Sequence, residues 1–125
     1  MSKTTLYEVN ADGKGLVIVT GRFTTTGTVS SGLGFTAADS GTGIYTVTFD
    51  DQYSGFISCV SSLEADTPGD VDGWRVATST YTAAASPTLV FNVVTDAASP
   101  TAADLPNATS FINFIAVFRN TSVTT

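Results

Sequence analysis

The side chains of this chain that could carry chemistry are mainly carboxylates, because histidine is absent and cysteine occurs once. Four acids fall within residues 64–73, namely Glu64, Asp66, Asp70 and Asp72. Asp70 and Asp72, followed by Gly73, echo the start of a calcium loop, but the later acidic ligands of such a loop are missing. Turn residues also surround these acids, so we interpret the segment as a solvated turn and expect no metal and no cofactor.

The residue types present do not make up a known catalytic set. Without histidine the chain cannot build a His-centred triad, and nothing activates Cys59 as a nucleophile. No pair of carboxylates stands out for acid–base hydrolysis. The glycine-rich run at residues 31–34 does not lead into a predicted helix, so it fails as a phosphate loop. We therefore expect a protein that is not an enzyme.

Aromatic side chains offer a binding chemistry instead. Trp74 and Tyr81, together with Tyr45 and Tyr53, could form a platform on which a sugar ring stacks. Aromatics at strand ends more often belong to a core edge or an interface. Both interpretations stay open, with Trp74 and Tyr81 as the candidate glycan-binding residues.

Composition limits the partners. The chain has 125 residues, a formal net charge of −6 and only 13% charged residues, whereas threonine occurs 22 times and serine 13 times. An acidic chain with five scattered cations does not predict a nucleic-acid partner. No apolar run approaches the roughly 20 residues of a membrane helix, so we expect no membrane partner and no export signal. The low charge favours either hydroxyl-covered strand faces or a surface covered by other subunits.

Alternating apolar residues predict strands nearly throughout, separated by Gly, Ser and Pro turns. The strands are expected at residues 16–24 (bent at Gly21), 34–38, 44–49, 56–63, 74–82, 88–95 and 110–120. Such a series predicts an all-β fold, a single antiparallel β-sandwich or jelly-roll-like barrel over residues 15–125. Residues 1–14 are expected to form an extended N-terminal arm.

The last of these strands is apolar on both faces. One face carries Phe111, Ile115 and Val117 with Asn113, and the other carries Ile112, Phe114, Ala116 and Phe118. A strand of this kind must be covered on both sides. Covering the second face is expected to need a loop of the same subunit or a neighbouring subunit.

Three runs carry a family resemblance: residues 21–25 (GRFTT), residues 41–50 (GTGIYTVTFD) and residues 114–122 (FIAVFRNTS). They resemble small structural proteins of tailed bacteriophages, in particular capsid decoration (cement) proteins and related head-fibre or tail-fibre domains. The resemblance implies an all-β domain, commonly a homotrimer, mounted on the capsid surface of a virion and made in the cytoplasm of the bacterial host. It transfers no catalytic or ligand residues.

On this interpretation the partners are further copies of the chain and the major capsid protein. The candidate trimer interface comprises Phe111, Ile112, Phe114, Ile115 and Phe118. The candidate shell contacts of the arm are Leu6, Tyr7 and Val9. The alternative is a fibre or spike module that binds a host-surface glycan or receptor.

Overall fold

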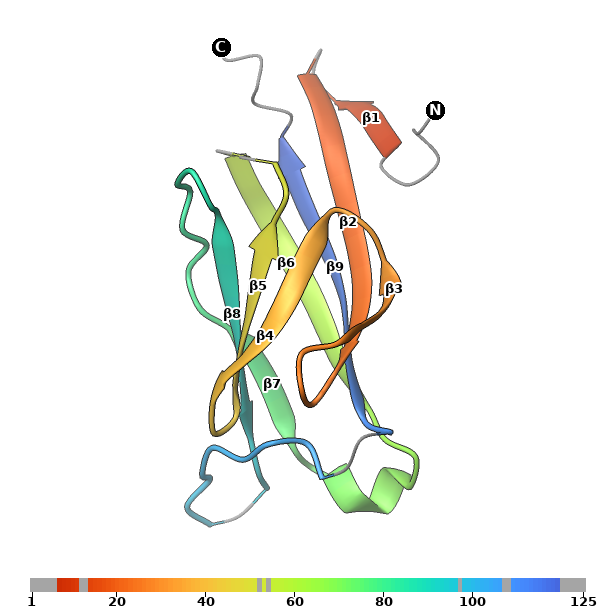
Figure 1. Cartoon of the computed structure of the whole chain (residues 1–125), viewed down its shortest axis with the longest axis vertical. Helices are drawn as coiled ribbons and strands as arrows, with labels where there is room; N and C mark the ends of the chain where they lie inside the picture. The colour runs from red at the N-terminus through yellow and green to blue at the C-terminus, as the bar shows by residue number, and fades with distance from the viewer. Residues whose placement is uncertain are drawn as a thin grey trace.

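The computed structural model describes residues 7–11, 14–51, 53, 55–96, 98–106 and 109–119, with side chains from residue 16 onward. Two antiparallel sheets pack against each other in a β-sandwich, which confirms the predicted fold class (Figure 1). Sheet A contains β1 (Tyr7–Ala11), β2 (Lys14–Thr24), β3 (Val29–Gly32), β6 (Gly55–Glu64) and β9 (Phe111–Arg119). Sheet B contains β4 (Phe35–Gly41), β5 (Ile44–Phe49), β7 (Arg75–Thr78) and β8 (Thr88–Val94).

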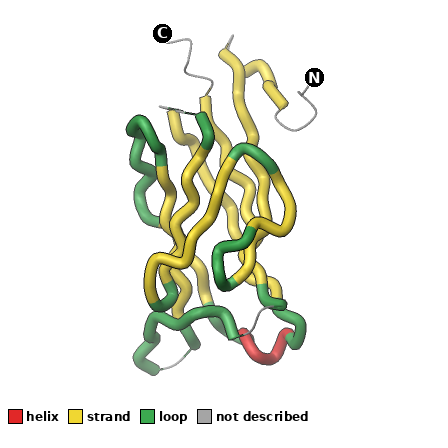
Figure 2. Tube along the Cα trace, viewed as in Figure 1, coloured by secondary structure: helices red, strands yellow, loops and turns green. Residues whose placement is uncertain are grey.

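The order of strands decides which surfaces remain open. In sheet A, β9 lies between β2 and β6, while β1 and β3 both pair with the other side of β2. In sheet B the order is β4-β5-β8-β7. Loops gather at the two ends of the sandwich, and a short 3-10 helix, η2 (Pro68–Val71), lies in the connection from β6 to β7 (Figure 2). Strand β6 therefore ends sheet A on one side.

Alternation along the strands builds the core between the sheets. On β9 the buried residues are Ile112, Phe114, Ala116 and Phe118. Sheet B supplies the opposite layer from β5 (Tyr45, Val47, Phe49) and β8 (Leu89, Phe91, Val93). Burial of each large apolar side chain contributes roughly 1.5–3 kcal/mol. The second face of β9 is thus covered by the chain's own sheet B.

Glycines allow close packing at two points. Gly21 does not interrupt β2, which pairs in continuous register with β9 through that residue. Gly21 instead leaves room for the ring of Phe35, whose Cζ lies 2.2 Å from where a Cβ on Gly21 would stand. Gly43, with φ 70°, forms the β4–β5 turn, where a Cβ would meet the Val93 carbonyl oxygen at 2.7 Å.

Two strand predictions differ from the structure. The expected strand at 74–82 stops at Thr78, because the chain then turns so that Tyr81 enters the core. Strand β3 was not predicted, since its sequence of valine, serines and glycine has no apolar alternation. Among the described residues, no helix has the length and apolarity needed to cross a membrane.

Candidate interaction surface

The outer face of sheet A carries apolar side chains that no other layer of the described chain covers. Ile18 and Val117 are neighbours in the register of β2 and β9, and Val60 lies opposite Ile115 across β6 and β9. Val60 is 67% exposed and Ile115 is 49% exposed. These four residues are called the apolar stripe below. A hollow of about 130 Å³ lies on it, lined in part by Val60, Ile115 and Asn113.

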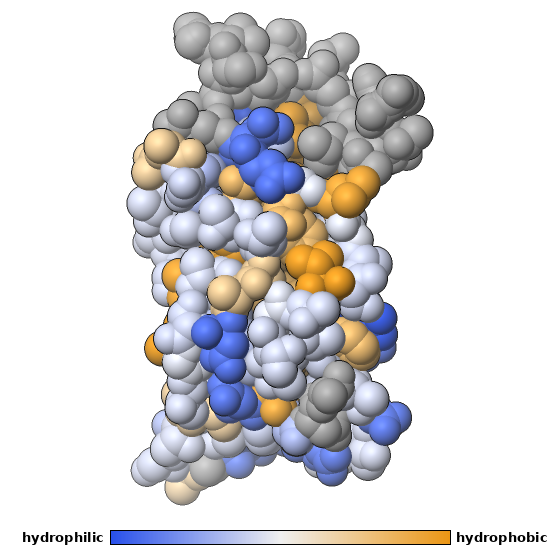
Figure 3. Space-filling view, in the orientation of Figure 1, coloured by the Kyte–Doolittle hydropathy of each residue, from blue (hydrophilic) through white to orange (hydrophobic). Residues whose placement is uncertain are grey.

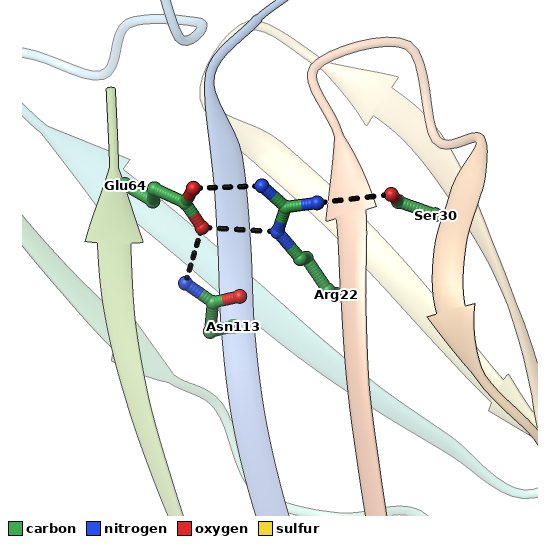
Figure 4. A network of polar contacts seen from close by, with 4 residues as sticks. All are labelled: Arg22, Ser30, Glu64 and Asn113. Carbon is green, nitrogen blue, oxygen red and sulfur yellow. Dashed lines mark hydrogen bonds and ion pairs between the residues drawn. The ribbon is translucent and has the colours of Figure 1, made fainter. Parts of the chain in front are cut away.

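A polar cluster lies on the same face, beside the stripe (Figure 4). The Arg22 guanidinium donates from Nε to Glu64 Oε1 at 3.0 Å and from Nη2 to Glu64 Oε2 at 2.7 Å. Its Nη1 donates to Ser30 Oγ at 3.1 Å, and Asn113 Nδ2 donates to Glu64 Oε1 at 3.2 Å. The guanidinium carbon lies 3.6 Å from the ring centre of Phe111. The cluster therefore joins β3, β2, β9 and β6.

The electrostatics of the cluster follow from this pairing. Hydrogen bonds from Arg22 and then from Asn113 to the carboxylate lower the pKa of Glu64. The hydrogen bond to Glu64 raises the pKa of Arg22. Both side chains are about one-third to two-fifths exposed, at 33% and 43%, so solvent screens the pair. Because each charge already has its partner, the cluster acts as a clamp across the strands rather than as reactive chemistry.

The outer face of sheet B has a different character. Its β4 and β5 residues include Thr36, Ala38, Thr46 and Thr48, which alternate with the core residues. In Figure 3, where β4 and β5 lie toward the viewer as in Figure 1, most of the surface has intermediate hydropathy, with scattered polar and apolar groups. The contiguous aliphatic stripe on sheet A is thus the more distinctive interaction surface of the described chain.

The candidate trimer-interface residues divide between the two faces of β9. Phe111 and Ile115 lie on the outer face, with Phe111 under Arg22 and Ile115 in the apolar stripe. Ile112, Phe114 and Phe118 are at most 2% exposed and lie in the core, so they cannot line a surface between subunits. The physical reason is that sheet B covers them within one chain. The interface candidates are therefore corrected to the outer-face residues.

The expected arm lies only partly within the described residues. Strand β1 pairs antiparallel with β2, so that Tyr7 is in register with Ile18 and Val9 with Leu16. Leu6, and the side chains of Tyr7 and Val9, lie outside the described residues.

The proposed aromatic platform does not form. Tyr81 is buried, stacks on Phe56 with ring centres 5.5 Å apart, and donates its hydroxyl hydrogen to the Tyr53 carbonyl oxygen. Tyr45 and Tyr53 are buried as well. The tyrosines therefore serve the core, because their rings are needed between the sheets. Trp74 alone of the four remains half-exposed.

Trp74 lies at a groove between the β6 edge of sheet A and β7 of sheet B. The groove has a volume of about 440 Å³ and is lined by Ser61, Ser62, Leu63, Val71, Trp74, Arg75 and Val76. Sequence reasoning did not find it, because its two walls are brought together only by the packing of the sheets.

The acidic segment and Cys59 show no catalytic arrangement. Within the described residues, no three His, Cys, Asp or Glu side chains gather as a metal site. Pro68–Val71 of the acidic segment form η2. Cys59 faces the core side of β6, and burial raises the pKa of its thiol to about 11. A thiol with that pKa stays protonated near neutral pH and is a poor nucleophile.

The polar cluster was also missed from the sequence, although one signal pointed to it. Asn113 is the single polar residue inside the apolar run 111–118, and an isolated polar residue in such a strand needs a partner. Its partner Glu64 is 49 residues away and meets it only through the β6–β9 register.

No family model, no curated protein and no solved structure matches this chain.

Proposed function

We propose that this chain is a structural protein of a bacteriophage virion, a capsid decoration protein that acts by binding rather than by catalysis. The apolar stripe on the outer face of sheet A carries the proposal. The stripe joins aliphatic side chains across three strands, with Val60 and Ile115 exposed and Ile18 and Val117 half-buried. Adjoining apolar side chains of this kind favour a protein-binding surface. The resemblance in three sequence runs favours a phage shell as the setting.

The proposed assembly is a homotrimer bound to the major capsid protein. In a closed ring of three, each subunit contacts its neighbours through one pair of patches. Phe111 and Ile115 remain the interface candidates on β9. The stripe, together with the β-strands around it, suits broad contact of many small groups, by which a cement protein would hold capsomers together. Residues 1–14, with Leu6, Tyr7 and Val9, are proposed to add shell contacts.

The test compares two lysine substitutions that differ only in their face. Val60→Lys places a charge in the apolar stripe, whereas Thr36→Lys places the same charge on the outer face of sheet B. Light scattering gives the mass in solution, and sedimentation with expanded shells gives occupancy. We expect Val60→Lys to lower the mass or the occupancy, while Thr36→Lys leaves both at the wild-type value. A wild-type chain that stays monomeric and does not bind shells would refute the proposal.

The alternative proposal, a fibre or spike module that binds a host-surface glycan, depends on Trp74 alone. A half-exposed indole at the wall of a groove is the kind of side chain on which a sugar ring stacks. Loss of host-cell binding in Trp74→Ala, with a folded protein and unchanged mass, would favour this alternative. Unchanged binding to cells in that variant would remove it.

A further inference from the structure

Strand β6 is a long, open edge. It has ten residues, pairs with β9 on one side, and ends the strand order of sheet A on the other. Open edges are usually protected by lysine, proline or inward-facing charge. The sequence of β6, GFISCVSSLE, has no lysine or proline, and its one charge, Glu64, is held by Arg22. After an irregularity near Ile57, residues 58–64 pair regularly with β9. The regular part of this edge is therefore a template for another strand.

The groove at Trp74 lies along this same part of β6. Ser61, Ser62 and Leu63 form one wall, and Trp74 and Val76 belong to the other. Leu63, Val71, Trp74 and Val76 supply apolar side chains to the lining, beside the polar Ser61, Ser62 and Arg75, and all four apolar residues are half-buried. Strand addition takes its affinity from main-chain hydrogen bonds and its specificity from pockets for alternate side chains. The β6 edge and the groove together supply both elements.

The charges around the groove select the partner. Asp70 and Asp72 flank the lining residue Val71 and are exposed. The carboxylate of Asp96 lies against Gly73, next to Trp74. Arg75 is the cation that lines the groove among the described residues. Three carboxylates on residues that adjoin the groove, against one guanidinium that lines it, leave a negative potential, which attracts a basic segment and disfavours an acidic one.

We propose that the groove binds an extended, basic segment of a partner protein, which adds as a strand beside residues 58–64 of β6. An apolar side chain of that segment enters between Leu63 and Trp74, and flanking Lys or Arg side chains lie near Asp70 and Asp72. This site shares strand β6 with the apolar stripe, but it uses the edge of β6 and the groove between the sheets rather than the outer face of sheet A, and it does not depend on the proposed shell function.

The test uses the single tryptophan of the chain as its reporter, since Trp74 lines the groove. The probe is the tryptophan-free peptide acetyl-KTVTVTVK-amide, titrated into the full chain while Trp74 emission is recorded. Three comparison peptides are used. One carries glutamate in place of both lysines. The other two carry N-methyl groups on alternate amides, one for each of the two registers in which an added strand can turn its amides toward β6. We expect saturable binding of the basic peptide, and at least about tenfold weaker binding of the acidic peptide and of one N-methylated register.

Matched protein variants test the charge argument. Asp72→Asn should weaken binding of the basic peptide about two- to fivefold. Asp50→Asn, which removes an exposed carboxylate at the far end of β5, should leave it unchanged. Melting temperatures of both variants show whether the fold is retained.

Four results would overturn the inference. The first is no saturable change in Trp74 emission up to about 1 mM peptide, and the second is equal affinity for the acidic and basic peptides. The third is equal affinity for the parent and both N-methylated peptides, and the fourth is a higher affinity for maltohexaose than for any peptide. The last result would identify a sugar site. None of them alters the solution mass or the Val60→Lys comparison, so failure here is distinguishable from failure of the shell proposal.

Discussion

Substitution of Gly21 by alanine tests how the two sheets meet. A Cβ at Gly21 would lie 2.2 Å from Cζ and 2.4 Å from Cε1 of Phe35, and 2.8 Å from Cε1 of Phe114. Phe35 is 5% exposed and packs edge-on against Phe114, with ring centres 5.0 Å apart. The added methyl group therefore enters an aromatic contact that joins sheet B to sheet A.

The cost can be worked from these distances. To reach an ordinary contact of 3.4 Å from 2.2 Å, the edge of the Phe35 ring must retreat by about 1.2 Å. Phe114 blocks part of that retreat, so the packing of the pair is disturbed. Overpacking of a core costs about 1–3 kcal/mol. Alanine restricts the unfolded chain and returns about 0.4–1 kcal/mol. We expect Gly21→Ala to lower the free energy of unfolding by about 1–2 kcal/mol.

Urea unfolding followed by Trp74 emission measures this change, at concentrations over which the solution mass is constant. Gly69→Ala is the matched control, because a Cβ there meets nothing within 4 Å. The control should stay within about 0.5 kcal/mol of the wild type.

A double variant separates the proposed contact from a general effect of alanine in the strand. Phe35→Leu removes the ring atoms that a Cβ at position 21 would meet. In that background Gly21→Ala should cost much less, with an interaction energy of about 1 kcal/mol. Equal stability of Gly21→Ala and wild type, or strictly additive costs in the double variant, would refute the packing argument.

Three further predictions follow from single groups. Because pairing lowers the pKa of Glu64 in the folded chain, its carboxylate stabilises the wild type fully above the carboxyl pKa of the unfolded chain, and this stabilisation is lost as the pH falls through the folded pKa. Glu64→Gln should therefore be less stable than the wild type near neutral pH, and the urea unfolding curves of the two proteins should converge in acid. Curves that differ equally at every pH would contradict this. Tyr45→Phe should cost about 1–3 kcal/mol in urea unfolding, because the Tyr45 hydroxyl accepts the Leu105 N–H at 3.1 Å in a buried site; a cost near zero would show that Leu105 finds another acceptor. Cys59 should react with a disulfide reagent at pH 8 at least about tenfold more slowly when folded than in urea, because burial raises the thiol pKa to about 11; equal rates would show that β6 opens readily.

Much of the strand pattern could be predicted because β-structure leaves a local signal. The hairpin of β4 and β5 follows from the alternation in residues 44–49 and the glycines before it, and the structure has it there. Strand β9 was predicted with nearly its observed bounds. Strand β3 was not, since polar, glycine-containing strands have no alternation to read. The prediction of an aromatic platform was wrong for a related reason, because the sequence shows where an aromatic ring occurs but not whether it is buried.

The all-β class, the absence of histidine chemistry and the two side-chain sets of β9 all follow from the order of the amino acids. A period of two sorts residues onto opposite faces, but it does not say which face meets the second sheet. Tertiary structure decided that Ile112, Phe114 and Phe118 face sheet B and that Ile115 faces outward. It also joined Arg22 to Glu64, 42 residues apart, and opened the groove beside β6. These features depend on the pairing of distant strands and on the packing of one sheet against the other, which no local pattern records.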